Sequence, residues 1–502
     1  MNNLSNKLEL VRLGLDTKYE FIVYIHAGCS IDKSEGFETY TQVVVTGKKK
    51  SIVATLTIVT SDILKMNQAS LSEIAWQRLG AKEGDEITIS HLSPVTSLRH
   101  VRRKIYGKTI SAQGFDEIMR DIVAGKYSNI HLASFITACA KENLSINEIT
   151  NLTKAMIHTG EVLHWEHPFI MDKHSVGGIP GNRTTPIVVA IVAAAGLIIP
   201  KTSSRAITSP SGTADTIETM TPVNININKM RKIVNKEGGC FVWGGAIGLS
   251  PGDDIIIKVE RPLDLDSESQ MIASVLSKKV AAGATHVVID VPVGPTAKIR
   301  SDKTFLRLKK YFSIIGTALG LNVKVLKFEG IQPLGIGIGP ALEAKDILAI
   351  LRNEIKLPLD LKNKAIDIAG VILEFGKKSS PGKGKELARF LLDSGAAYQK
   401  FIAICEAQGG FCEPGSAPYT YDITAKHAGL VTSIDNRTLA TLAKLAGAPH
   451  DPNAGIEFFA KINTSIETGQ TLYRIHAETK GELEYAVAFA YSMPNIVTIM
   501  RN

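Results

Sequence analysis

An uncharged apolar run from Ile187 to Ile199 constrains the fold most, because it separates two segments rich in glycine and hydroxyl side chains. The run is too short to cross a bilayer, so it predicts a helix buried against a sheet. A buried helix with a polar loop at each end can bring both loops to one cleft. The two loops together therefore indicate a binding site more strongly than either loop alone.

The first polar segment, Asp172 to Thr185, has the composition of an anion-binding loop. A lysine supplies positive charge, hydroxyl groups donate hydrogen bonds, and glycines let backbone N–H groups approach a ligand closely. A Walker loop is disfavoured, because the lysine of that motif would fall at Arg183. The residues that fit an anion are Lys173, Ser175, Thr184, Thr185, Gly177, Gly178 and Gly181.

The second polar segment, Ser203 to Asp215, contains hydroxyl residues, an arginine and a glycine. Its sequence resembles the signature of the thymidine phosphorylase family, with S-S-R-A-I at the start and G-T-A-D-T-I-E from Gly212 onward. Pro210 and Ser211 depart from the small residues usual in the family. K-H-S-x-G-G at Lys173 matches as well, and the similarity extends from about Arg103 to the C-terminus. P-G-N-R-T-T and S-S-R-A-I-T-S are more similar to the long branch that includes the archaeal AMP phosphorylases.

The resemblance and the residue patterns together predict a multi-domain α/β protein. Residues 1–95 are expected to form a β-rich domain, with strands at Tyr19–Ile25, Tyr40–Val45 and Ser51–Val59. Residues 96–167 show helical periodicity and resemble the family's small helical domain, to which 252–281 return. Residues 168–405 should form the α/β phosphate-binding catalytic domain with a mixed sheet, and 406–502 a C-terminal α+β domain similar to a barrel-sandwich. Ser70 with Glu73, and Ser145 with Glu148, have the spacing of capping boxes.

The resemblance also implies roles for individual residues. The phosphate-contacting positions of the family match Lys173, Ser175, Thr185, Ser203 and Thr213. Ser274 and Lys278 match a serine and a lysine that bind the pyrimidine in the thymidine enzymes, whereas the corresponding arginine has only Arg261 as a candidate, one residue out of register. The nucleotide-contacting positions of the AMP phosphorylases match Gly178, Ser204, Arg205, Ala206, Ile207, Thr208 and Ser209, and Lys298 is a further candidate.

Two residues are candidates for the proton donor to the departing base. His174 matches the histidine proposed in the thymidine enzymes, and an imidazole beside phosphate can act as an acid near neutral pH. Asp266 matches the donor assigned in the AMP phosphorylases, a role that would require a raised pKa. We favour Asp266, since the local sequence follows the AMP branch and His174 is better placed to contact phosphate.

Composition limits the other partners of the chain. A net charge of +8 on 502 residues is compatible with an anionic substrate, and the basic clusters lack the interleaved aromatic residues of a nucleic-acid site. Five cysteines without C-x-x-C spacing suggest neither a disulfide framework nor a zinc site. Without a signal core or membrane-length run, we expect a cytoplasmic protein that contacts no membrane. We expect no metal and no cofactor, with inorganic phosphate as a co-substrate.

The resemblance implies phosphorolysis of a nucleoside N-glycosidic bond by a homodimer or a higher homo-oligomer. Thymidine is the first candidate substrate, and a nucleoside 5′-monophosphate such as AMP is the alternative. An anthranilate-type phosphoribosyltransferase shares the architecture but should carry an acidic metal pair, which is not convincing in this sequence. A non-catalytic phosphate sensor would keep the anion-binding loops and lose the donors, yet His174 and Asp266 are both present.

Overall fold

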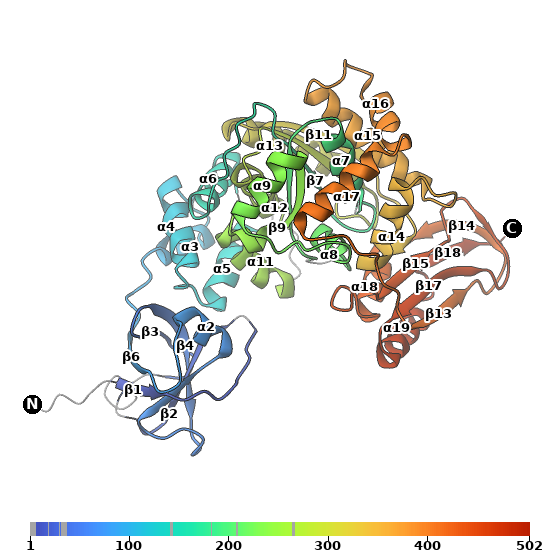
Figure 1. Ribbon diagram of the computed structural model, residues 1–502. Coiled ribbons are helices and arrows are strands. Elements are labelled where there is room, and N and C mark those ends of the chain that lie inside the picture. Colours follow the sequence, from blue (N-terminus) through green and yellow to red (C-terminus); the bar gives the residue numbers. More distant parts are fainter. Residues whose placement is uncertain are drawn as a thin grey trace, which may run out of the picture. The chain divides into compact units, whose positions relative to one another are not determined.

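The computed structural model describes residues 7–18, 20–29, 31, 38–140, 144–181, 183–206, 209–263 and 267–501. The chain divides into two compact units: residues 1–139 with 258–263, and residues 140–257 with 264–502. The boundary between residues 139 and 140 falls within the helical domain expected at 96–167. The later segment that joins the first unit, 258–263, is shorter than the segment 252–281 that we expected to return to the helical domain. Figure 1 colours the chain from blue at the N-terminus to red at the C-terminus.

Six strands of the first unit form the predicted β-rich module. They are β1 (Lys7–Leu10), β2 (Ile22–His26), β3 (Gln42–Thr46), β4 (Ser51–Val59), β5 (Gln68–Leu71) and β6 (Glu86–His91). They close a barrel in the order β1-β5-β2-β4-β3-β6. Buried residues alternate with more exposed ones along β3 and the first part of β4, which is the pattern of a strand with one face on a core.

The helix between strands β5 and β6 begins after a different N-cap residue from the predicted one. Helix α2 (Glu73–Leu79) has Ser72 as its N-cap residue, so the predicted capping box of Ser70 and Glu73 is wrong. Ser70 lies in β5, where its Oγ accepts a hydrogen bond from Leu13 N at 3.3 Å. The pairing of β5 with β1 and β2 fixes Ser70 in an extended conformation, and this tertiary constraint overrides the local signal.

Four helices follow the barrel in sequence. They are α3 (Leu98–Ile105), α4 (Ala112–Val123) and α5 (Asn129–Cys139) in the first unit, and α6 (Ile146–His158) in the second. The predicted apolar stripes are buried, as Phe115 and Ile118 on α4 and Phe135 on α5 illustrate. The capping box of Ser145 and Glu148 at the start of α6 is confirmed, with hydrogen bonds in both directions.

The central part of the second unit alternates strands with helices. Its strands are β7 (Met171–Ser175), β8 (Ile199–Ser203), β9 (Gly239–Trp243), β10 (His286–Val293) and β11 (Asn322–Glu329). Its helices are α7 (Thr184–Ala194), α8 (Thr213–Glu218), α9 (Ile227–Glu237), α10 (Gly244–Ile247), α12 (Glu268–Ala281), α13 (Asp302–Ala318), α14 (Pro340–Leu351), α15 (Leu359–Phe375), α16 (Gly384–Asp393) and α17 (Ala396–Gln408); α11 (Pro251–Leu263) contributes to both units.

The strands of this part pair only in parallel within the described residues, in the orders β11-β10-β7 and β8-β9. The described strands β7 to β11 therefore form parallel sheets and not the mixed sheet that we expected for this domain. A parallel bridge between Ile170 and Ile198 precedes β7 and β8, so the carboxyl ends of these strands lie at one edge. The apolar run is helix α7 followed by the start of β8, because the chain turns at Gly196 with φ of 75°. Helix α7 is buried and packs against α15 and α17 (Figure 1).

The C-terminal part contains two small antiparallel sheets. Its elements are β12 (Gly337–Ile338), β13 (Tyr419–Thr424), β14 (Gly429–Ile434), α18 (Asn436–Leu445), β15 (Gly455–Phe458), β16 (Ser465–Ile466), β17 (Thr471–Ala477), α19 (Lys480–Ser492) and β18 (Val497–Met500). The sheets have the orders β12-β15-β17-β13 and β16-β14-β18. Among the described residues of the whole chain, no helix is both long and apolar enough to span a membrane.

Candidate active site

The two polar segments found in the sequence meet at the carboxyl edge of β7 and β8. Ser175 is the last residue of β7, and Ser203 is the last residue of β8. Ligands of parallel α/β sheets bind outside the carboxyl ends of the strands. After Ser175 the chain turns through Gly177 and Gly178, whose φ values of 41° and 85° are readily adopted only by glycine.

Lys173 is fully buried and points to hydroxyl and carboxylate partners. Its Nζ lies 2.8 Å from Asp290 Oδ1 on β10. It also donates to Thr184 Oγ1 at 2.6 Å and to Thr185 Oγ1 at 3.3 Å, at the start of α7. Three of the predicted anion-binding residues therefore converge, and Asp290, which sequence reasoning missed, organises them. The sequence feature that could have identified Asp290 is the presence of an acidic residue inside the apolar run His286–Val293.

Asp290 also fixes Ser175. The Ser175 Oγ donates to Asp290 Oδ2 at 2.8 Å and lies 3.0 Å from the carbonyl oxygen of Gly181. The paired register of β7 and β10 sets Ser175 opposite Asp290. A Cβ at Gly181 would stand 2.6 Å from Ser175 Oγ and 2.9 Å from a ring carbon of Pro292, so the loop closes over this hydroxyl only with a glycine.

The environment of His174 is electropositive. Burial, together with the positive charges of Lys279, Lys201, Lys173 and Lys278, holds the pKa of His174 well below its usual range. The imidazole is therefore neutral at neutral pH in the ligand-free protein. A neutral imidazole can donate one hydrogen bond to an anion but carries no additional proton for a leaving group.

The second loop is organised by Asp215. Its Oδ2 accepts hydrogen bonds from the backbone N–H groups of Ala206 at 2.6 Å and Gly212 at 2.9 Å. Its Oδ1 lies 3.2 Å from Arg205 Nη1, and the guanidinium also stacks on the Trp243 ring at 4.9 Å from its centroid. Ser204 is exposed, and Ser209 and Thr213 are half-buried. Arg205 is thus held by protein groups.

Gly212 is expected to be intolerant of any side chain. A Cβ there would meet three backbone atoms of the same loop, in Ser204, Arg205 and Ala206, each at 2.8 Å. We expect Gly212→Ala to destabilise the protein by about 1–3 kcal/mol and to weaken phosphate binding, measured by chemical unfolding and calorimetry. Gly244→Ala is the matched control, since its nearest neighbour would be Ser203 O at 3.7 Å. Unchanged phosphate affinity in Gly212→Ala would contradict the assignment of this loop to the site.

A buried ion network connects the two loops. Arg183 Nη2 in the first loop lies 3.3 Å from Glu343 Oε1, and Thr216 Oγ1 donates to the other oxygen, Glu343 Oε2, at 3.3 Å. Thr216 Oγ1 is also 2.8 Å from Ser211 Oγ in the second loop. Arg183 Nη1 lies 3.6 Å from Asp346 Oδ2. Burial raises the pKa of Glu343 to about 7 and that of Asp346 to about 6.

The predicted base-binding pair Ser274 and Lys278 lies on α12, one turn apart. Both side chains contact Asp253 of α11: Ser274 Oγ donates to its Oδ2 at 3.0 Å, and Lys278 Nζ lies 2.5 Å from the same oxygen. Asp253 is buried, so it holds these side chains in fixed positions. Sequence reasoning missed Asp253, because its distance along the chain from α12 gives no local signal.

Lys298 is exposed and lines a cavity of about 280 Å³. Two arginines also line this cavity, which makes it basic overall. Its residues are Ser267, Glu268, Met271, Lys298, Ile299, Arg300, Thr304 and Arg437.

Three predicted site residues, Asp266, Ile207 and Thr208, lie outside the described residues, as does the side chain of Arg261. Among the described residues, no group of three or more His, Cys, Asp or Glu side chains could hold a metal ion.

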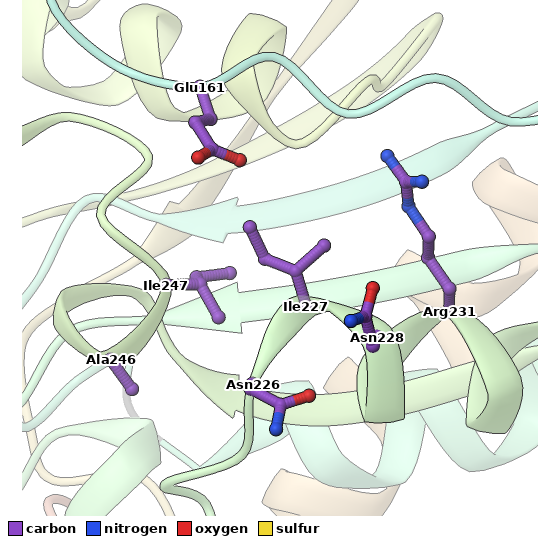
Figure 2. A pocket seen from close by; sticks show the side chains of 7 residues that line it. All are labelled: Glu161, Asn226, Ile227, Asn228, Arg231, Ala246 and Ile247. Atoms are coloured by element: carbon purple, nitrogen blue, oxygen red, sulfur yellow. The ribbon is translucent and has the colours of Figure 1, made fainter.

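A second cavity of about 410 Å³ lies apart from the predicted residues. Figure 2 shows Glu161 on one side and the α9 side chains Ile227, Asn228 and Arg231 on the other. No predicted site residue is among its lining side chains, most of which are exposed. We assign it no part in the site.

Three family models match the chain. Residues 99–160 match the helical bundle domain of a glycosyl transferase family, and 167–398 match its α/β domain. Residues 430–496 match the C-terminal domain of pyrimidine nucleoside phosphorylases. These matches, with the parallel sheets and the polar carboxyl edge, define a pentosyltransferase enzyme.

Relatives that match this chain over nearly its full length show the family to which it belongs. A Hahella chejuensis protein provisionally named a thymidine phosphorylase is 51% identical over 494 residues, covering 98% of each chain. A Legionella pneumophila protein of the same provisional name is 51% identical over 498 residues, covering 99% of this chain and 96% of its own. The chain belongs to the thymidine phosphorylase family.

Solved structures of anthranilate phosphoribosyltransferases share the fold. The Thermus thermophilus enzyme aligns with a TM-score of 0.51 at 21% identity, covering 62% of this chain and 99% of its own. The Saccharomyces cerevisiae enzyme also has a TM-score of 0.51, at 16% identity, covering 63% of this chain and 99% of its own. At these identities the likeness concerns the fold alone.

Proposed function

We propose that the protein catalyses phosphorolysis of thymidine, which yields thymine and 2-deoxy-α-D-ribose 1-phosphate. The observation that carries the proposal is the convergence of Lys173, Ser175 and Thr185 at the carboxyl edge of β7, in a chain whose full-length relatives bear the name thymidine phosphorylase. Inorganic phosphate is the co-substrate, and no further cofactor takes part.

In this reaction a phosphate oxygen attacks C1′ of the sugar as the bond from C1′ to the base nitrogen breaks. The electron pair of that bond goes to the base, which takes a proton from an acid of the enzyme. Phosphate supplies the nucleophile, so the protein mainly positions it and balances charge. Ser274 and Lys278, anchored by Asp253, would orient the base from α12.

A nucleoside 5′-monophosphate is the second candidate substrate. The basic cavity with Lys298, Arg300 and Arg437 supports it, because a 5′-phosphate needs cationic side chains beyond those that hold the attacking phosphate. The product would then be ribose 1,5-bisphosphate.

A substrate panel tests the function. We expect phosphate-dependent release of thymine from thymidine, followed by absorbance or chromatography, to exceed base release from uridine, AMP, CMP and UMP. Faster release from a monophosphate than from thymidine would select the second candidate. Failure to release any base in the presence of phosphate would contradict both.

We also propose a homodimer, since family dimers associate largely through the helical domain. The amphipathic helices between Phe115 and Ile157 would contribute to this interface. We expect light scattering at micromolar concentration to give the mass of two chains of 54.2 kDa. The mass of a single chain would refute the proposal.

A further inference from the structure

Two buried aspartates lie in the parallel sheet, Asp290 opposite Ser175 at the carboxyl end of β7 and Asp172 three residues earlier on β7. Each of them holds two buried lysines. Asp290 is the first, on the face of β7 that carries Lys173. Its Oδ1 is 2.8 Å from Lys173 Nζ, and its Oδ2 is 3.6 Å from Lys364 Nζ. Lys364 Nζ also donates to the carbonyl oxygen of Pro180 at 3.0 Å, which directs it toward the first loop.

Asp172 is the second aspartate, and it belongs to the opposite face of β7, because neighbouring residues of a strand alternate between faces. Its Oδ2 lies 2.7 Å from Lys279 Nζ on α12, and its Oδ1 lies 3.4 Å from Lys201 Nζ on β8. Asp172, Lys201 and Lys279 are all buried. His174 follows on the same face, so this group lies directly beneath it.

The two groups contain four lysines but only two carboxylates. Electrostatic attraction from Asp360 also reaches Lys364, yet Asp360 forms its own ion pair with Lys461 Nζ at 3.0 Å. Buried charges are costly unless they are paired, so an excess of positive charge in the interior calls for an anion. Burial and the positive charge of Lys201 lower the pKa of Lys279 to about 7, although the carboxylate of Asp172 raises it, which is consistent with this excess.

We propose that Asp172 and Asp290 are positioning residues whose four lysines carry more positive charge than the two carboxylates neutralise when phosphate is bound, and that the bound phosphate dianion balances this excess. The anion would lie at the carboxyl end of β7, beside His174 and Ser175. The identification of this anion as the co-substrate rests on the proposed function, whereas the charge excess does not.

Deletion of one lysine charge at a time tests the proposal. Lys201→Met on one face and Lys364→Met on the other each leave their aspartate one remaining lysine. Each variant of the full chain should bind inorganic phosphate about tenfold or more weakly in isothermal titration calorimetry, since a dianion interacts strongly with a nearby buried charge. Lys327→Met is the control, because Lys327 is an exposed lysine on β11 of the same sheet; its affinity should stay within about twofold of the parent.

A second measurement needs no variant. At about pH 8.5 Lys279, with its pKa of about 7, is mostly neutral in the ligand-free protein. A nearby dianion raises the pKa of a lysine, so phosphate binding should take up protons from the buffer. Calorimetry in two buffers of different ionisation enthalpy measures this uptake, and Lys279→Met should reduce it. His174 does not contribute, because its pKa is well below its usual range.

The outcomes separate this proposal from the proposed function. Phosphate affinities of folded Lys201→Met and Lys364→Met equal to that of the parent would overturn it, as would phosphate binding without proton uptake. Weaker binding in both variants, together with no base release from any nucleoside, would support the charge-balancing role and contradict phosphorolysis. Normal base release with unaltered phosphate binding in the variants would contradict only the charge-balancing role.

Discussion

Lys173→Met is expected to weaken phosphate binding by about 2 kcal/mol or more and to lower the free energy of unfolding by about 3–5 kcal/mol. The binding loss follows from removal of a charge-assisted contact. The stability loss follows because Asp290 stays buried, with Lys364 at 3.6 Å as its remaining lysine. Calorimetry with inorganic phosphate and urea unfolding monitored by circular dichroism give the two quantities.

A double variant separates the two effects. Asp290→Asn, added to Lys173→Met, replaces the carboxylate that has lost its nearer lysine by a neutral amide that can still accept a hydrogen bond from Ser175. We expect the double variant to regain most of the lost stability while phosphate binding stays weak. Parent-like phosphate affinity in Lys173→Met would remove Lys173 from the site, and recovery of binding in the double variant would assign it a purely structural role.

Asp266→Asn is expected to slow phosphorolysis of a nucleoside with a poor leaving base by about 100-fold or more. Analogues whose base leaves without protonation, such as nitrophenyl-type ones, should react almost as fast as with the parent. The reason is that burial and four lysines keep His174 neutral in the ligand-free protein, which leaves Asp266 as the better candidate acid. Steady-state rates on both substrate types are the measurement.

His174→Asn is the companion variant. We expect it to weaken phosphate binding, because His174 lies next to Lys173 and Ser175 at the end of β7. If Asp266→Asn and the parent are equally active on a poor leaving group, the donor role returns to His174. In that case His174→Asn should show the selective loss on poor leaving groups.

The local features of the chain were predictable from the sequence. The capping box of Ser145 and Glu148 uses atoms a few residues apart, so its spacing alone identified the start of α6. The two polar segments around the apolar run likewise predicted both loops of the candidate site. The capping box of Ser70 and Glu73 failed because strand pairing of β5 outweighed the local preference.

The sequence by itself determined which residues are candidates for anion binding, since glycine, lysine and hydroxyl groups at short spacing define a loop that can hold phosphate. Only the tertiary structure decided what holds those residues in place. Asp290 contacts Ser175 across 115 positions of the chain, and Glu343 contacts Arg183 across 160. Such pairs depend on which strands and helices become neighbours in the folded core, and this is set by non-local packing that no short spacing in the sequence encodes.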